Sequence, residues 1–290
     1  MLDTVRLRSP YVTDDLAAAV ARSCVLRIGM DGATGERLWE FTSGSLRGSW
    51  DTRVSVQVRR EEWRPVGQER RLILVPCAPY VLVEGSVHKA LLGHNVYGGP
   101  LDPVTACAWF IDEIGRRLEV RLPAASEWVH RRVDWAEAYD LGSYEAVEEF
   151  FAGLNLARFP RRRANRYGDM GFQAPGDTTT LKLYGKGEEF GKHDFRRLRH
   201  LDGGRVATNL QHQANAILRV EVEVHSRKLD SDFGGNPSIV RVTRQYLEGV
   251  HDIEVGRLLR EGGPDMEIVR THREVNARLH DEYGGRLANI

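Results

Sequence analysis

Ile217-Leu-Arg-Val-Glu-Val-Glu-Val-His225 alternates apolar and ionisable side chains almost without interruption. A period of two predicts a β-strand, with the valines on one face and Arg219, Glu221, Glu223 and His225 on the other. This ionisable row has two interpretations. It is either the solvated face of an ordinary amphipathic strand, or a set of carboxylate and imidazole ligands suited to a divalent cation.

The rest of the chain predicts an α+β fold of mainly antiparallel sheets with helices packed outside them. Short apolar segments between turn residues predict the other strands, at residues 2–8, 25–28, 38–41, 54–58, 71–76, 80–84, 128–135 and 178–184. Capping residues and helical periodicity predict helices at 13–21, 87–92, 103–118, 143–154 and 188–199. The second half of the chain repeats this element order, which suggests a duplicated unit.

The domain organisation follows from that repeat. We expect one catalytic α+β region over residues 1–236, with pseudo-repeat halves at 1–120 and 121–236. We expect a helical C-terminal segment over residues 237–290, with a helix break near His251.

The composition implies that any DNA-binding surface comes from a local cluster of basic residues. The 290 residues include 41 Lys and Arg against 41 Asp and Glu, so the chain is not a polycation. Its three cysteines lie far apart without metal-ligand spacing, which predicts reduced cysteines in a cytosolic protein. No apolar run approaches ~18 residues, and the alternating start reads as a strand, so we expect neither a transmembrane helix nor a signal peptide.

A second polar strand face is predicted at residues 128–135. By the same period of two, His130, Arg132 and Asp134 share one face. If this strand lies beside residues 217–225, Asp134 and Glu221 would share one cation. Phosphoryl transfer commonly uses Mg²⁺ or Mn²⁺ held by a few carboxylates.

Residues 178–184 predict a strand that ends at Tyr184, and Lys186 follows two positions later. A phenol has an ordinary pKa near ~10, so its attack on phosphorus needs a cation that stabilises the phenolate. The alternative is a half-buried strand tyrosine without chemistry. Tyr167 and Tyr139 are the competing nucleophiles.

Two basic runs flank this tyrosine, at residues 161–166 and 195–200. Such clusters bind phosphates, and neighbouring aromatic side chains can stack on unpaired bases. The alternative is a charged, solvated surface. The second run lies on the predicted helix at 188–199, whose opening acids Glu188 and Glu189 suit the helix dipole, so we expect no catalytic role for them.

Four blocks resemble a known family. Ser86-Val-His-Lys89-Ala-Leu-Leu-Gly93-His94-Asn95-Val-Tyr-Gly98 resembles the Ser-Pro-x-Lys…Gly-His-Asn-x-Phe-Gly segment of the filamentous-phage and plasmid replication initiators, the phage II/X family. Arg132-Val-Asp134 is similar to its Arg-Ile-Asp strand, and residues 181–186 to its tyrosine–lysine segment. Arg219-Val-Glu221 is similar to its Arg-x-Glu strand. The blocks keep the family's order and cover roughly residues 80 to 230.

The resemblance implies a rolling-circle replication nickase with an HUH-like or RRM-like unit. Tyr184 would cut one strand at an origin, form a 5′-phosphotyrosine link and leave a 3′-hydroxyl that primes synthesis. Lys186 would neutralise the phenolate or the phosphate. The implied cofactor is Mg²⁺ or Mn²⁺. The implied partners are single-stranded or cruciform origin DNA and a host helicase and polymerase, in the cytoplasm of a bacterium.

These patterns together define the candidate site. The expected metal ligands are Asp134, Glu221, His94 and Glu223. The expected DNA contacts are basic or amide side chains: Arg132, Arg161, Arg162, Arg163, Arg166, Lys182, Arg196, Arg197, Arg219 and Asn95. Two alternatives stay open. A DNA-binding module without chemistry would bind DNA regardless of metal, and a metal-dependent nuclease that uses water would leave no protein on its product.

Overall fold

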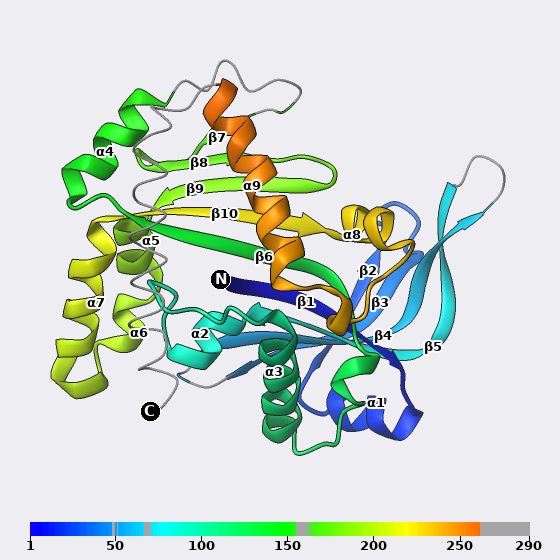
Figure 1. Ribbon diagram of the computed structural model, residues 1–290. Helices are drawn as coiled ribbons and strands as arrows, with labels where there is room; N and C mark the ends of the chain where they lie inside the picture. Colours follow the sequence, from blue (N-terminus) through cyan, green and yellow to red (C-terminus); the bar gives the residue numbers. More distant parts are fainter. Residues whose placement is uncertain (48–49, 51, 67–70, 155–161, 163, 262–290) are drawn as a thin grey trace.

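In the computed structural model, ten antiparallel strands form one sheet that organises the described part of the chain (Figure 1). The structure describes residues 1–290 except 48–49, 51, 67–70, 155–161, 163 and 262–290. The strand order is β2-β3-β4-β5-β1-β6-β10-β9-β8-β7. The predicted α+β class with antiparallel strands and outer helices is therefore confirmed.

The elements have the following bounds. The strands are β1 Leu2–Tyr11, β2 Val25–Met30, β3 Arg37–Arg47, β4 Arg53–Val66, β5 Arg71–Ser86, β6 Val129–Asp140, β7 Asn165–Arg166, β8 Gly171–Ala174, β9 Thr179–Gly185 and β10 Ile217–His225. The α-helices are α1 Asp14–Ala21, α2 Val87–Leu92, α3 Pro103–Leu118, α4 Tyr144–Gly153, α5 Lys186–His193, α6 Phe195–Leu198, α7 Arg205–Asn215, α8 Ser226–Phe233 and α9 Arg244–Glu261.

The two halves of the sheet have the same connectivity. From the centre outward, the first half places its strands as β1, β5, β4, β3 and β2, and the second as β6, β10, β9, β8 and β7. Each half has a helix after its first strand, α1 or α4, and another directly after the strand beside it, α2 or α8. The two halves of the sheet thus share one strand order, and the duplicated unit stays a prediction.

Strand β10 separates two layers, as its alternation predicts. Val220, Val222 and Val224 are buried in the main core, which helices α3 and α9 help to cover. Figure 1 shows these two helices crossing one face of the sheet. The opposite face of β10 carries the ionisable row, so one strand serves both the core and the candidate site.

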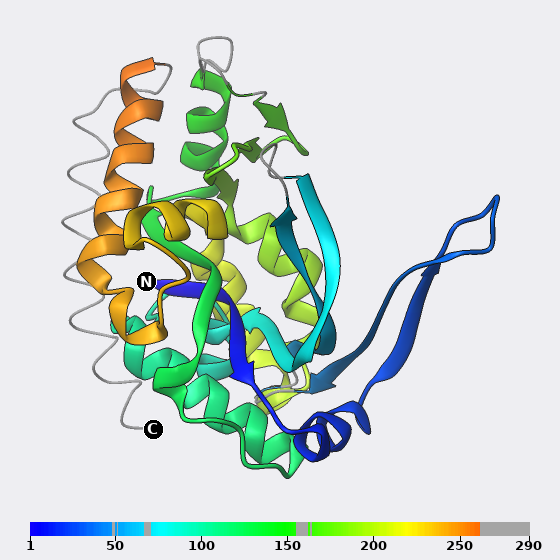
Figure 2. The same cartoon turned by 90° about the vertical axis from the view of Figure 1, so that its right-hand side faces the viewer.

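A smaller core covers one end of the polar face. There α5, α6 and α7 pack on the sheet around buried residues such as Phe190, Leu198 and Leu210. These helices lie on the far side of the sheet from α9 and α3 (Figure 2). Helix α7 was not predicted from the sequence because its buried stripe is only Ala207, Leu210 and Ala214.

Two local expectations were wrong. The predicted helix break near His251 is absent, since α9 runs through this residue, which is fully buried. His130 does not share a face with Asp134. Val5 pairs with Val133 but Leu7 pairs with His130, so a β-bulge in β6 turns His130 toward the core face.

Strands β2 and β3 form an arm that extends away from the body (Figure 2). Its apolar side chains remain open to solvent, among them Val25, Leu26, Ile28 and Met30. None of the helices in the described residues is long and apolar enough to cross a membrane.

The buried core and the exposed arm predict unequal losses of stability for the same leucine-to-alanine substitution. Leu183 in β9 is fully buried in the main core, whereas Leu26 in the arm is 54% exposed. We expect Leu183→Ala to lower the free energy of unfolding by about 2–5 kcal/mol, and Leu26→Ala by at most about 0.5 kcal/mol. Urea unfolding of both variants measures the difference. Equal losses would contradict this description of the core.

Candidate active site

Three adjacent strands bring the predicted carboxylates together. Asp134 lies on β6 directly opposite Glu223 on β10, and Glu221 lies one step along the same face of β10. On the other side of β10, Glu221 pairs with Lys182 of β9. Asp134 and Glu221 thus occupy neighbouring positions of one polar face, which is the adjacency that a shared cation would require.

The ammonium group of Lys182 lies among all three carboxylates. Its Nζ is 3.0 Å from Glu221 Oε1, 3.0 Å from Glu223 Oε2 and 3.8 Å from Asp134 Oδ2. Burial alone would lower the pKa of Lys182, but the three acids raise it. A positive charge therefore already occupies the centre of the group.

Arg132 closes the other side of the carboxylate group. Its Nη2 and Nε donate to Asp134 at 2.6 and 2.8 Å, and its Nε is 3.1 Å from Glu223. Arg132 Nη1 also donates to Glu84 Oε1 at 3.2 Å. Lys182 and Arg132, both expected to contact DNA, are thus engaged with acids in the free protein.

The acids respond differently to this environment. Burial raises the pKa of Asp134 well above its usual value, although Arg132 opposes the shift. Burial would also raise the pKa of Glu223, but a hydrogen bond from His225 and the charges of Lys182 and Arg132 lower it to about 2. The site thus combines an ionised Glu223 with a buried Asp134 that holds its proton more tightly, and a cation bound between them would favour the ionised form of Asp134.

Tyr184 borders this group. Its hydroxyl donates to Glu221 Oε2 at 3.2 Å, and Tyr184 pairs with Arg219 across the strands. Burial and the charge of Glu221 raise the pKa of Tyr184 well above its ordinary value. The phenol is therefore neutral at rest, and attack on phosphorus requires additional positive charge nearby.

Lys186, at the start of α5, is fully buried beneath Tyr184. Its Nζ lies 5.8 Å from the centre of the Tyr184 ring and donates to Asn95 Oδ1 at 2.6 Å. Burial lowers the pKa of Lys186 to about 8, even though the adjacent Glu189 opposes the shift. Such a lysine can hold or release a proton near neutral pH.

Glu189 lies beside Lys186 in the candidate site, a position that the sequence did not indicate. It pairs with Lys186, and its Oε1 accepts from Lys89 Nζ at 3.1 Å. Burial would raise the pKa of Glu189, but the charges of Lys186 and Lys89 lower it to about 2. Glu188, one residue earlier, instead pairs with the exposed Lys192. Sequence spacing missed this distinction because it depends on which side of α5 faces the sheet.

A buried network supports the tyrosine and its lysine from below. Arg219 Nη1 donates to the Asn95 carbonyl oxygen at 2.8 Å, and its Nη2 lies 3.2 Å from Asp3 Oδ2. Asn95 Nδ2 in turn donates to Asp3 Oδ2 at 3.2 Å. Arg219 and Asn95 are both buried, so they position the site and do not present their side chains to DNA as expected. Asp3 had no signal in the sequence.

His94 lies apart from the carboxylate group. Its Nδ1 accepts from the Val96 backbone N–H at 3.3 Å, and its ring is 4.9 Å from that of Tyr97. Burial and the charge of Lys186 lower the pKa of His94 to about 4. No contact among the described residues links His94 to Asp134 or Glu221, so the structure gives no support to its expected role as a ligand.

The predicted basic runs divide into accessible and engaged residues. Arg196 is exposed, and Arg166 is exposed although it donates to two carbonyl groups at the end of α4. Arg162 forms a salt bridge with Glu254 at 3.0 Å, and its expected contact with DNA stays a prediction. Arg197 donates to Trp50, Gly93 and Asp194. Arg161 and Arg163 lie outside the described residues.

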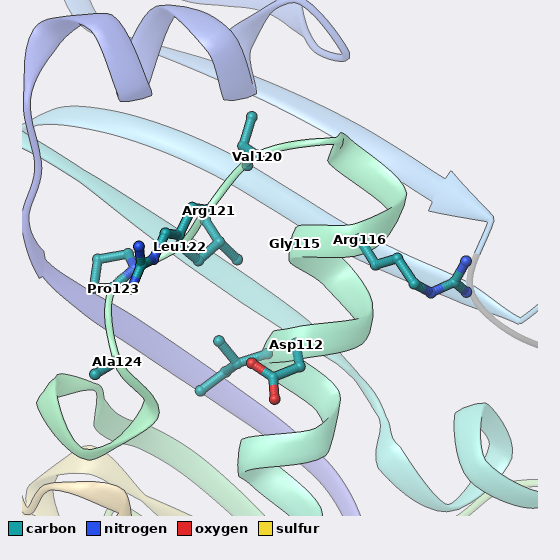
Figure 3. A pocket seen from close by; sticks show the side chains of 9 residues that line it. Asp112, Gly115, Arg116, Val120, Arg121, Leu122, Pro123 and Ala124 are labelled. Carbon is teal, nitrogen blue, oxygen red and sulfur yellow. The ribbon is translucent and has the colours of Figure 1, made fainter.

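A pocket of about 230 Å³ opens beside the tyrosine. Tyr184 and Tyr167 both line it, together with Glu189 from α5. A larger pocket, of about 380 Å³, lies at the end of α3 (Figure 3). Its ionisable side chains are Asp112, Arg116 and Arg121, without a tyrosine or a second acid. The smaller pocket is therefore the candidate entrance for DNA.

The opposite face of the sheet holds a different set of ligand atoms. Glu137, His251 and Asp252 each offer one atom within 4.8 Å of the others. Among the described residues, no other trio of acid, histidine or cysteine ligand atoms is this tight. The Asp134 carboxylate group is more open because Lys182 lies inside it.

Comparison with known sequence families places the chain in one of them. A sequence family described as the N-terminal region of a phage replication-associated protein matches residues 1–248. The chain belongs to this family of phage rolling-circle replication initiators. No curated protein and no solved structure matches the chain. The matched region includes every described residue of the carboxylate group and of the tyrosine–lysine pair.

The two neighbouring glutamates of α5 predict a pH-dependent difference in stability. The lowered pKa of Glu189 gives a stabilisation that is complete above the ordinary value of 4.5 and lost as the pH falls to about 2. We expect Glu189→Gln to lower the free energy of unfolding at pH 7 by about 1–3 kcal/mol, and the loss to shrink toward pH ~2.5. Urea unfolding at several pH values measures it.

Glu188→Gln is the matched control, since it removes only a surface pair and should cost about 0.3–0.5 kcal/mol. Equal losses for the two variants, or a loss at Glu189 that persists at pH ~2.5, would contradict the assigned pairing.

Proposed function

We propose that this protein starts rolling-circle replication by nicking one DNA strand at an origin and rejoining it later through a phosphotyrosine intermediate. The observation that carries this proposal is the hydrogen bond between the Tyr184 hydroxyl and Glu221, beside Asp134 and Glu223. Family membership supports a replication role. The site would act on single-stranded or cruciform origin DNA in the cytoplasm of a bacterial host, with a host helicase and polymerase completing replication.

The carboxylate group fits a hard divalent cation. Its donors are carboxylate oxygens of Asp134, Glu221 and Glu223, the ligand class that Mg²⁺ and Mn²⁺ prefer. The ammonium of Lys182 already neutralises part of this negative charge. Its position shows that a cation at the centre of the three carboxylates is favourable. A bound ion would polarise the scissile phosphate and stabilise the developing charge.

The reaction is an exchange of one phosphodiester for another. The Tyr184 oxygen attacks phosphorus, the bond from phosphorus to the 3′-oxygen breaks, and a 5′-phosphotyrosine forms. Glu221 Oε2, which already accepts the tyrosine hydroxyl hydrogen bond, is placed to take its proton. The leaving 3′-oxygen takes up a proton and becomes the primer hydroxyl. Reversal of these steps with another 3′-hydroxyl rejoins the strand without ATP.

Lys186 stabilises the charge that the attack creates. Asn95 and Glu189 bind its ammonium group and hold it beside the tyrosine ring, and the Lys186 side chain is fully buried. A positive charge fixed there favours phenolate over phenol as the proton leaves. Lys182 would move from the acids toward a phosphate when DNA and an ion enter. Arg196 and Arg166 are placed on the surface to follow the DNA backbone.

A denaturing gel tests the nucleophile. We expect the wild-type protein with Mn²⁺ and single-stranded origin DNA to form a covalent adduct that survives denaturation. Tyr184→Phe should lose it completely, because no oxygen remains to attack. Tyr167→Phe, which alters the other tyrosine of the same pocket, should retain it. Asp134→Asn and Glu221→Gln should lower adduct formation by at least ~10²-fold while DNA binding persists.

The alternatives give other outcomes. Cleavage without an adduct, undiminished in Tyr184→Phe, would indicate a nuclease that uses water. Binding indifferent to Mn²⁺, with neither cleavage nor adduct, would indicate a DNA-binding module. An adduct that disappears in Tyr167→Phe and persists in Tyr184→Phe would reassign the nucleophile.

The position of Lys182 among the three carboxylates allows a second, simpler test. Because its ammonium neutralises the acids in the free protein, Lys182→Met should bind Mn²⁺ more tightly without DNA, by roughly tenfold or more. Isothermal titration calorimetry measures this affinity, and Lys192→Met, on the surface of α5, is the control. Unchanged or weaker Mn²⁺ binding in Lys182→Met would contradict a cation site at these three carboxylates.

A further inference from the structure

Glu137, His251 and Asp252 meet between the sheet and α9. Glu137 is on β6, on the core face opposite the candidate active site, whereas His251 and Asp252 are on α9. His251 Nδ1 lies 3.7 Å from Glu137 Oε1 and 4.0 Å from Asp252 Oδ1. All three ligand atoms lie within 4.8 Å of one another.

The hydrogen bond of His251 fixes where its ring proton lies. Its Nε2 is 3.4 Å from the carbonyl oxygen of Val220, the residue paired with Glu137 across β6 and β10. A carbonyl oxygen only accepts, so Nε2 carries a proton. The buried Nδ1 has no hydrogen-bond partner among the described residues. In a neutral ring, a lone pair therefore points at two carboxylates.

A lone pair facing two carboxylates is unfavourable unless a positive charge lies between them, either a proton on Nδ1 or a bound cation. We propose that this charge is a divalent transition-metal ion bound by His251, Glu137 and Asp252. One imidazole nitrogen and two carboxylate oxygens suit Zn²⁺ or Mn²⁺, whereas Mg²⁺ and Ca²⁺ favour oxygen ligands alone. A backbone carbonyl on the second ring nitrogen is the arrangement that orients ligand histidines in metal sites.

The surroundings allow an ion to enter and to be held. The side chain of Asp252 is 47% exposed and that of Glu137 is 17% exposed, while that of His251 is 1% exposed. Tyr139 donates to the other oxygen of Glu137 at 2.5 Å and so orients the carboxylate. The ion would join α9 to β6 and β10 and act as a structural clamp. Its role is independent of the proposed nicking, which uses the other face.

Thermal unfolding of chelator-treated protein tests the site. With Zn²⁺ at roughly a hundredfold excess over its dissociation constant, we expect the Tm to rise by roughly 5–10 °C. Mg²⁺ at the same concentration should have little effect. The rise should disappear in His251→Gln and in Asp252→Asn. It should persist in Asp134→Asn, which removes a carboxylate from the other face.

The visible absorption of bound Co²⁺ tests the ligands directly, since it depends on the nitrogen and oxygen atoms that coordinate the ion. The absorption should appear in the wild type and be lost in Asp252→Asn. This exposed residue can change without loss of the fold, so it decides the outcome if His251→Gln fails to fold. No rise in Tm for the wild type, or a rise that survives Asp252→Asn, would overturn the proposal, as would a rise lost only in Asp134→Asn.

Discussion

The pairing of β10 with β6 on one side and β9 on the other is the constraint on which the molecule depends. It fixes both faces of the sheet at once, because a slip of one residue would exchange the valines for the ionisable row. Burial of the valines therefore holds Glu221 and Glu223 in place. The site is precise because its acids lie on central strands and not on loops.

The sequence was informative wherever a pattern was local. The alternation in β10 indicated which side chains share a face, and the alternation at residues 128–135 placed Asp134 on a second polar face. That the two strands are neighbours is shown by the register of β6 and β10, which spacing did not indicate. The position of Lys182 among three acids depends on the register of β9, which no local pattern sets. Asp3 and Glu189 were missed because they reach the site from the first strand and from one side of a helix. The bulge that turns His130 away has no signature that alternation can detect.

The repeated connectivity relates this site to the whole sheet. Both halves of the sheet have the same order of strands, yet the three converging carboxylates occur in the second half, on β6 and β10. The first half contributes supporting residues across the central seam, such as Asp3 from β1 and Asn95 from the segment after α2. The second half thus carries the candidate catalytic groups, and the first half supplies buried residues that hold them in place.

The two edge strands of the sheet differ in length and in the exposure of apolar side chains. Strand β7 is two residues long, whereas β2 has six, and the side chains of Val25, Leu26, Ile28 and Met30 on it are open to water. An edge strand of this kind offers unpaired backbone groups next to apolar side chains, which is a template for an additional strand. The arm is therefore the edge at which an additional strand would meet apolar side chains, and it is the edge farthest in strand order from the strand carrying Tyr184.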